Sequence, residues 1–152
     1  MLTRRFFLVV GALFGLRAIV PLNVLASEPM IYSNSATGIA INGFDPVAYF
    51  TDGKPVEGMA EFSAQWKEAT WHFSSKENRA VFLATPEKYA PQYGGYCAFA
   101  MSYDAFATTV PEAWSIEDGK LYLNFSKGVR GDWLRDKQEH IISANDNWAA
   151  KF

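Results

Sequence analysis

The chain has 152 residues and one cysteine, and its 14 lysines and arginines against 16 aspartates and glutamates give a net charge of −2. A length of about 100–200 residues is typical of one folded domain. The 49% hydrophobic content excludes a wholly disordered chain. The near-neutral charge excludes the strongly basic surface typical of nucleic-acid-binding proteins. A single cysteine excludes an internal disulfide framework and a zinc site built from several thiolates.

The first 26 residues have the pattern of an export signal. Arg4 and Arg5 precede an apolar run over residues 6–15, and a small-residue cleavage site follows at residues 24–26. The sequence therefore predicts removal of this segment on export. It places the mature protein in the periplasm or otherwise outside the cytoplasm.

The type of export signal has two interpretations. Residues 3–8 (TRRFFL) resemble the twin-arginine export motif, which implies export of an already folded protein, and a general secretory signal is the alternative. An uncleaved anchor helix is disfavoured because Arg17 and Pro21 interrupt the apolar run, which is shorter than the roughly 20 residues of a membrane span. No membrane insertion is expected after the signal is removed.

Removal of residues 1–26 changes the charge of the protein. Three of the 14 basic residues and none of the 16 acidic residues lie in that segment, so 11 basic and 16 acidic side chains are left, a net charge of −5. Of the 24 aromatic residues, 21 stay in the remaining 126 residues. This aromatic supply can stabilise a small core without disulfides, since one buried aromatic side chain removes about 150–250 Å² from water.

The first half of the mature chain predicts a short helix followed by a hairpin. Residues 27–38 are expected to form a tether or an extended arm. Asp45 can cap a short helix over residues 47–50 that begins at a proline. Residues 61–73 alternate apolar and polar side chains around a turn at residues 67–68. Trp71 and Phe73 should face one side of that hairpin and His72 the other.

Helix signals follow the hairpin directly. Ser74 and Glu77 have the spacing of a capping box, and Thr85 should cap a second short helix that Pro86 begins. Gly94 and Gly95 interrupt the chain. Residues 96–101 form an apolar segment that is short enough to be either helix or strand.

A second hairpin and a final helical region complete the chain. The hairpin covers residues 114–125 and turns at Asp118 and Gly119. Ser126 opens the helical region, which carries an apolar stripe with a polar gap at residues 135–139. No internal repeat and no low-complexity segment is evident in the sequence.

Several of these segments together resemble a YHS domain. The resemblance rests on Asp-Pro-Val at residues 45–47, on residues 71–82, and on Pro-Glu-Lys-Tyr at residues 86–89, and it covers residues 42–92. Residues 95–125 resemble an extended, exported subgroup of the same family. The resemblance implies an α+β fold with a treble-clef-like core of β-hairpin plus helix, extended by a second hairpin and a C-terminal helix that covers the sheet. It predicts one domain over residues 27–152.

The resemblance also implies a metal site, which this sequence does not reproduce. Metal-binding members of the family place cysteines directly after Asp-Pro-Val and in the step from strand to helix. Here Ala48, Ser74 and Asn78 stand at those places. Alanine cannot bind a metal ion, and neutral serine and asparagine are weak ligands. The metal role of the family therefore does not transfer to these three positions.

The remaining soft ligands suggest a copper site elsewhere. Thiolate, imidazole and thioether together suit copper, Cu(I) above all, which favours a site of Cys97, His72 and Met101. The leading hypothesis is an exported accessory protein that binds a metal ion, copper first, and that acts with a protein partner in metal handling without catalysis. The alternative for Cys97 and Met101 is core packing, and for His72 a hydrogen-bonded position in a strand. Because an exposed thiol in an oxidising compartment is liable to oxidation, Cys97 is expected to be buried, bound to a metal ion, or paired with a cysteine of another chain.

Two further classes of function are alternatives to the copper hypothesis. A hydrolase could use Cys97 and His72 with Asp45 or Asp104, but no nucleophile motif supports it, so no enzyme activity is expected. A metal-free module that binds a small ligand or a protein would use rigid aromatic side chains, which gather near the two glycines of residues 94–95. The net charge of −5 favours a cationic or neutral partner, and no basic stretch indicates nucleic acid or membrane binding.

Overall fold

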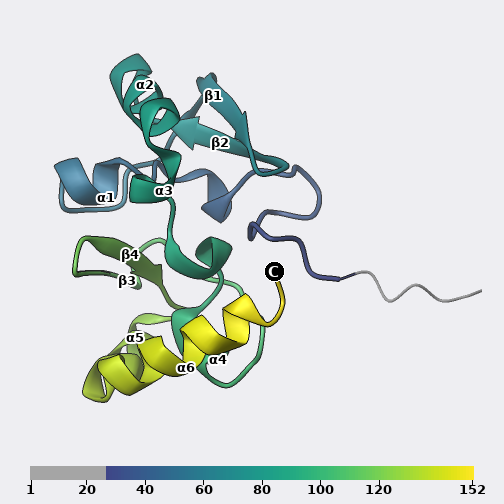
Figure 1. The fold of residues 1–152 in the computed structure, drawn as a ribbon. Helices are drawn as coiled ribbons and strands as arrows, with labels where there is room; N and C mark the ends of the chain where they lie inside the picture. The colour runs from purple at the N-terminus through teal and green to yellow at the C-terminus, as the bar shows by residue number, and fades with distance from the viewer. Residues whose placement is uncertain (1–26) are drawn as a thin grey trace, which may run out of the picture.

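The computed structural model describes residues 27–152 (Figure 1). It mixes helices with small antiparallel sheets, which confirms the α+β class. The first half of the chain contains η1 (Ile41–Gly43), α1 (Ala48–Thr51), β1 (Met59–Trp66), β2 (Ala69–Phe73), α2 (Lys76–Ala84) and α3 (Pro86–Tyr89). The second half contains η2 (Gln92–Gly95), α4 (Ala98–Ser102), β3 (Trp114–Glu117), β4 (Lys120–Leu123), α5 (Lys127–Arg135) and α6 (Lys137–Ala149). The predicted export signal lies outside the described residues.

The two hairpins form separate two-stranded sheets, β1–β2 and β3–β4. Both turn at the expected dipeptides. Lys67 and Glu68 have φ of 47° and 61°, and Asp118 and Gly119 have φ of 50° and 73°. Two successive residues with positive φ match the right-handed twist of paired strands, so each turn joins its strands tightly.

Serine residues cap α2 and α5, and the cap of α2 lies one residue later than predicted. The cap of α2 is Ser75, whose Oγ accepts a hydrogen bond of 3.1 Å from the backbone N–H of Asn78, and the predicted capping box at Ser74 is wrong. Ser74 is unavailable because its side chain binds Asp45 instead. Ser126 caps α5 as predicted, with 3.2 Å from its Oγ to the N–H of Val129.

Strand β4 lies between two hydrophobic cores. The core of the first half is built on Trp71, Phe73 and Phe82, and Leu121 and Leu123 of β4 point into it. The core of the second half contains the side chain of Tyr122, from the opposite face of β4. Successive side chains of a strand point to opposite faces, so β4 serves both cores at once.

The second core also holds the helices of the C-terminal half together. It is lined by buried side chains from η2, α4, β4, α5 and α6: Tyr93, Ala98, Met101, Tyr122, Trp133 and Ala144. Helix α6 packs chiefly along α4 and not across a sheet, and the side chain of Asn147 donates to the carbonyl of Met101 at 2.9 Å. The expected C-terminal helical region is divided in two: Trp133 of α5 packs on Tyr122 of β4, as expected of a helix that covers the sheet, whereas α6 lies along α4. None of the helices among residues 27–152 is long and apolar enough to span a membrane.

Residues 27–40 form an extended arm that packs against both halves, since the N–H of Thr70 in β2 donates to the carbonyl of Gly38 at 3.0 Å and Ile31 belongs to the core of the first half. The N–H of Tyr32 donates to the carbonyl of Gly94 at 2.9 Å, and Ile31 is buried. Gly94 has φ of 61°, and a β-carbon on it would lie 1.8 Å from the carbonyl oxygen of Met30. Glycine is needed at this position because of both its backbone conformation and the approach of the arm.

Candidate functional site

The step from β2 to α2 is held by the carboxyl group of Asp45, which is fully buried. Its Oδ1 accepts from the N–H of Val47 at 2.8 Å and so caps the short helix, as predicted. Its Oδ2 accepts from Ser74 twice, from the N–H at 2.8 Å and from the hydroxyl at 2.6 Å, and from the Nδ2 of Asn78 at 2.7 Å. We call this arrangement the Asp45 clasp.

The Asp45 clasp uses two of the three positions where the resembled family places metal-binding cysteines. Ser74 and Asn78 donate hydrogen bonds into the clasp, and the third position, Ala48, is a buried methyl group. Protein hydrogen bonds hold the step from strand to helix, so the residues present do not fit a metal ion there. Within residues 27–152, no group of three or more histidine, cysteine, aspartate or glutamate side chains is placed to hold a metal ion.

Cys97 and Met101 lie in one turn at the start of α4, where the N–H of Met101 donates to the carbonyl of Cys97 at 2.9 Å. The Cys97 thiol donates to Oδ1 of Asn124 at 3.6 Å and accepts from the N–H of Phe125 at 3.3 Å. Cys97 is 1% exposed and Met101 is wholly buried, with the side chain of Met101 in the second core. The thiol is thus buried and hydrogen-bonded, one of the states the sequence left open.

His72 lies on β2, on the half-buried face opposite Trp71 and Phe73, as predicted. It packs beside Gly58, where a β-carbon would come within 2.6 Å of the His72 β-carbon. His72 is paired with Ser63 of β1, whereas the Cys97 thiol is hydrogen-bonded to Asn124 and Phe125. The structure therefore groups Cys97 with Met101, and the copper site with His72 stays a prediction.

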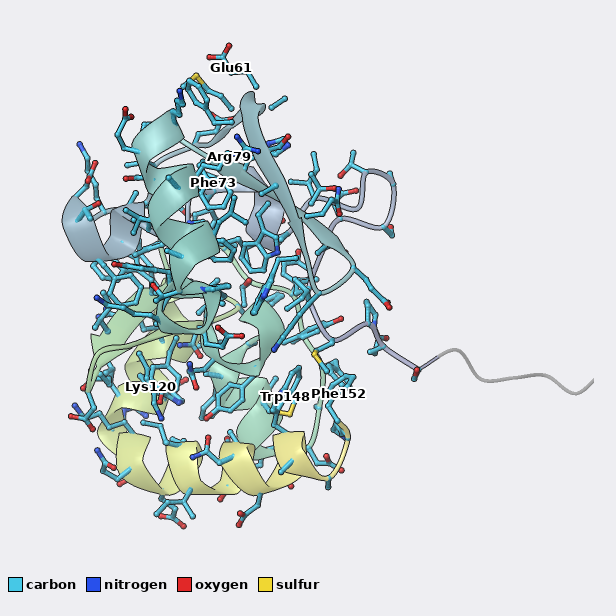
Figure 2. The ribbon with its side chains drawn as sticks, turned by 45° about the horizontal axis from the view of Figure 1, so that its top comes forward. Glu61, Phe73, Arg79, Lys120, Trp148 and Phe152 are labelled. Carbon is cyan, nitrogen blue, oxygen red and sulfur yellow. The ribbon has the colours of Figure 1, made fainter. Side chains whose placement is uncertain are left out.

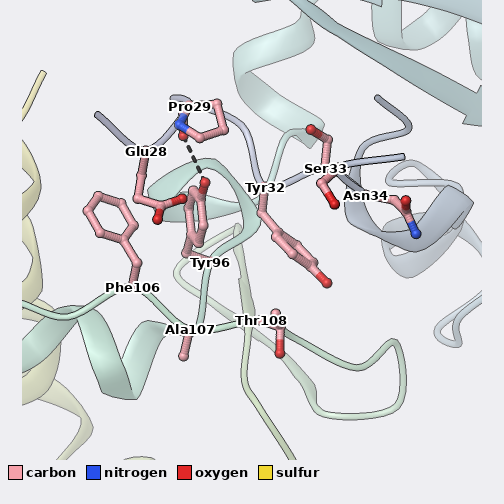
Figure 3. Close-up of a pocket in the computed structure, with 10 residues that line it drawn as sticks. Glu28, Pro29, Tyr32, Ser33, Asn34, Tyr96, Phe106, Ala107 and Thr108 are labelled. Atoms are coloured by element: carbon pink, nitrogen blue, oxygen red, sulfur yellow. Dashed lines mark hydrogen bonds between the residues drawn. The ribbon is translucent and has the colours of Figure 1, made fainter. Parts of the chain in front are cut away.

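A second candidate site is an open cleft of about 460 Å³ between the arm and the loop after α4 (Figure 3). Its walls include the rings of Tyr32, Tyr96 and Phe106. The ring centroids of Tyr32 and Tyr96 are 5.5 Å apart, and those of Tyr96 and Phe106 are 4.8 Å apart. We call this the aromatic cleft. Its lining comprises Glu28, Pro29, Tyr32, Ser33, Asn34, Ser35, Tyr96, Phe106, Ala107 and Thr108.

The aromatic cleft is acidic. Glu28 is the one charged side chain in the lining just described. Burial, and second to it the nearby Glu28 carboxylate, raise the pKa of Tyr96 to about 12, so its hydroxyl is neutral at physiological pH and donates to the carbonyl of Pro29 at 3.0 Å. Lys151 lies 5.4 Å from the Phe106 ring centroid, and its ammonium group pairs with Asp104 at 2.6 Å.

Rings beside a carboxylate attract cations, because the face of an aromatic ring carries partial negative charge.

The sequence indicated only part of this cleft. Tyr96 belongs to the aromatic group expected near the glycine pair, but Tyr32 and Phe106 lie outside it. Tyr32 was missed because it belongs to the arm, whose polar composition indicated a tether and carried no signal for packing.

The match to a known family covers the first hairpin and the step from β2 to α2. Residues 47–93 match the model of the YHS domain, so the chain contains a YHS domain in this part. YHS domains are associated in general with the handling of metals, copper among them. Neither the comparison with curated proteins nor that with solved structures finds a match to the chain.

Proposed function

We propose that the protein is an exported YHS-type binding module that takes a small organic cation, and not a metal ion, in the aromatic cleft. The observation that carries the proposal is the lining of the cleft, which combines three aromatic rings with one carboxylate. The function needs no catalysis. It corresponds to the metal-free alternative derived from the sequence.

The expected preference follows from the cation–π interaction. A cation over one ring is stabilised by about 0.5–2 kcal/mol, depending on how much water is displaced. A quaternary ammonium group is a suitable ligand because it has no hydrogen-bond donors and would lose little on leaving water. About 1.4 kcal/mol corresponds to a tenfold difference in Kd, so we expect a cation to bind at least about tenfold more tightly than a neutral molecule of the same shape.

The test compares choline with 3,3-dimethylbutan-1-ol, which replaces the quaternary nitrogen by carbon. Binding is measured by calorimetry and by the fluorescence change of Trp148, whose ring centroid lies 6.5 Å from those of both Tyr96 and Phe106. Choline should bind at least about tenfold more tightly than the neutral alcohol. Equal binding of the two, or binding of neither, would reject the proposal.

Variants locate the binding. Glu28→Gln should weaken choline binding at least about threefold, and Tyr32→Leu should weaken it further, because each change removes part of the attraction for a cation. The matched control is Glu61→Gln, which makes the same change in net charge at an exposed position of β1 outside the cleft lining. In Figure 2 Glu61 lies well apart from Phe152, whose ring centroid is 6.5 Å from that of Phe106 in the cleft. If Glu61→Gln weakens binding as much as Glu28→Gln, the effect is one of overall charge and the cleft is not the site.

Copper binding is kept as a second candidate, because Cys97 and Met101 lie within one helical turn. The same protein, purified from its native compartment, is analysed for bound metal and then titrated with Cu(I) against a competing chelator. A stoichiometric site that Cys97→Ser abolishes would favour the copper hypothesis over the metal-free proposal. If the purified protein retains no metal, and the wild-type protein and Cys97→Ser bind Cu(I) equally weakly, the metal-free proposal is supported.

A further inference from the structure

The two halves of the chain have the same order of elements. From η1 to α3 the order is one 3-10 helix, one short helix, two strands and two helices, and it recurs from η2 to α6 (Figure 1). The two sets occupy the upper and lower parts of the view in Figure 1. The shared order therefore covers six elements in each half.

The elements also agree in register. Helix α2 covers Lys76–Ala84 and helix α5 covers Lys127–Arg135, nine residues each with a constant difference of 51 in residue number. The same difference relates the two turns, from residues 67–68 to residues 118–119. At the start of each half the difference is 52, because a run of three positive φ values recurs there. Ile41, Asn42 and Gly43 have φ of 41°, 59° and 82°, and residues 93–95 have φ of 55°, 61° and 88°. Three successive positive φ values are rare, so their recurrence is a specific match.

The cores agree in side-chain geometry at the same difference of 51. In the first half, Trp71 of β2 packs on Phe82 of α2 with centroids 5.2 Å apart and an interplanar angle of 33°. In the second half, Tyr122 of β4 packs on Trp133 of α5 at 5.1 Å and 36°. Both helices also begin with a serine cap, as described above.

The clasp recurs with different chemistry. Asp45 accepts from the N–H groups of Val47 and Ser74. Its counterpart at a difference of 52 is Cys97, whose thiol accepts from the N–H of Phe125, the counterpart of Ser74. The thiol also binds Asn124, whose Oδ1 accepts from the N–H of Phe99, the counterpart of Val47.

We propose that residues 93–149 are a second YHS-type unit, a diverged copy of residues 41–89, in which the Cys97 thiol takes the place of the Asp45 carboxyl group. The family match ends at residue 93 and does not include this second unit. The counterparts of Ala48, Ser74 and Asn78 are Ala100, Phe125 and Val129, none of which binds metal ions through its side chain. The inference assigns Cys97 a positioning role and does not depend on the proposed ligand.

The proposed repeat is not evident from the sequence alone. Few identities survive between the two halves, among them Gly43 with Gly95 and Ser75 with Ser126. The difference in residue number also changes from 52 to 51 within the loop before the hairpin. A pattern sought at one fixed spacing is lost under both effects, whereas the backbone retains it.

One unpaired group provides a direct test of the register. The Nε of Arg130 donates to the hydroxyl of Ser115 at 2.8 Å, and the Nε of its counterpart, Arg79, is buried with no hydrogen-bond partner in the described structure (Figure 2). The counterpart of Ser115 is Ala64, which has no hydroxyl group. The proposed repeat explains the unpaired Nε, because the partner residue differs between the two units.

The experiment is a pair of double-mutant cycles read by thermal unfolding. Ala64→Ser should supply the missing acceptor and raise Tm by about 2–6 °C, and the gain should disappear in an Arg79→Met background, since methionine has no N–H donor. In the second unit, Ser115→Ala should lower Tm by a similar amount and lose that effect in an Arg130→Met background. Ala60→Ser, on the exposed part of the same strand, is the control and should leave Tm unchanged.

Coupling in both cycles would support the repeat. Coupling in the second cycle alone would overturn it, because the 64–79 pair would then not correspond to the 115–130 pair. An equal Tm change for Ala64→Ser in both backgrounds would overturn it as well. Neither result depends on whether the aromatic cleft binds a cation, so failure here is distinguishable from failure of the proposed function.

Discussion

Replacing Asp45 by alanine should be among the most damaging single changes in the protein. The carboxyl group is fully buried and accepts four hydrogen bonds of 2.6–2.8 Å. A hydrogen bond contributes about 1 kcal/mol net to stability, so loss of all four costs about 4 kcal/mol. For a chain of this size that loss lowers Tm by roughly 10–20 °C.

An asparagine at the same position separates the contributions within the Asp45 clasp. Its single oxygen can accept from Ser74 and Asn78, but its amide nitrogen then faces the N–H of Val47. Loss of that helix cap should cost about 1–2 kcal/mol, which is less than for alanine. Urea unfolding followed by circular dichroism measures both variants, and an unchanged m-value shows that only stability has changed.

Asp52→Ala is the matched control. Asp52 is an exposed aspartate at the C-terminal end of α1 and accepts one hydrogen bond from Thr51, so its replacement should cost under about 0.5 kcal/mol. A loss of less than about 1 kcal/mol for Asp45→Ala would refute the view that hydrogen bonds hold this step. Stabilisation of the wild-type protein by added Cu(I) or Zn²⁺, lost in Asp45→Ala, would refute the metal-free assignment of the clasp.

Three further predictions address the second half of the chain. Cys97→Ser should cost about 1 kcal/mol or less and Cys97→Ala about 1–3 kcal/mol, since only serine retains an acceptor for the N–H of Phe125. Equal losses would argue against the hydrogen-bonding role. Burial raises the pKa of Tyr96 in the folded state to about 12, above the ordinary value near 10, so the folded state resists ionisation of this side chain. The contribution of Tyr96 to the free energy of unfolding is therefore fully present below pH 10 and is lost as the pH rises from 10 to 12. Unfolding measured at a series of pH values, with absorbance at 295 nm to follow tyrosine ionisation, tests this prediction. Gly94→Ala should displace the arm, because its β-carbon would lie 1.8 Å from a backbone oxygen, and should lower Tm more than Gly119→Ala, which has a similar φ and no neighbour within 4 Å. Equal Tm losses for the two glycine variants would show that backbone strain alone is responsible.

Local signals in the sequence predict most of the elements of the first half. The turn at residues 67–68, the opposite faces of Trp71 and His72, and the family resemblance all follow from short-range patterns, and each is confirmed. The capping prediction fails by one residue for a physical reason. The hydroxyl of Ser74 has a stronger acceptor in Asp45, which is 29 residues away in sequence and invisible to a local pattern.

The site was harder to predict, because it depends on contacts between distant segments. Nothing in residues 27–38 indicates that this segment brings Tyr32 against Tyr96. The thiol of Cys97 has its partners 27 and 28 residues later in the chain, and its identity as the single cysteine favoured metal chemistry over hydrogen bonding. Long-range pairing of this kind carries no periodicity in the sequence.

Strand β4 has a consequence for how the protein unfolds. Leu121 and Leu123 complete the core of the first half while Tyr122 completes that of the second, so neither core is whole without this strand. A fragment ending at residue 93, where the family match ends, would expose the apolar face that these leucines cover. The two halves should consequently melt in one cooperative transition, and the smallest fragment that folds must extend through β4.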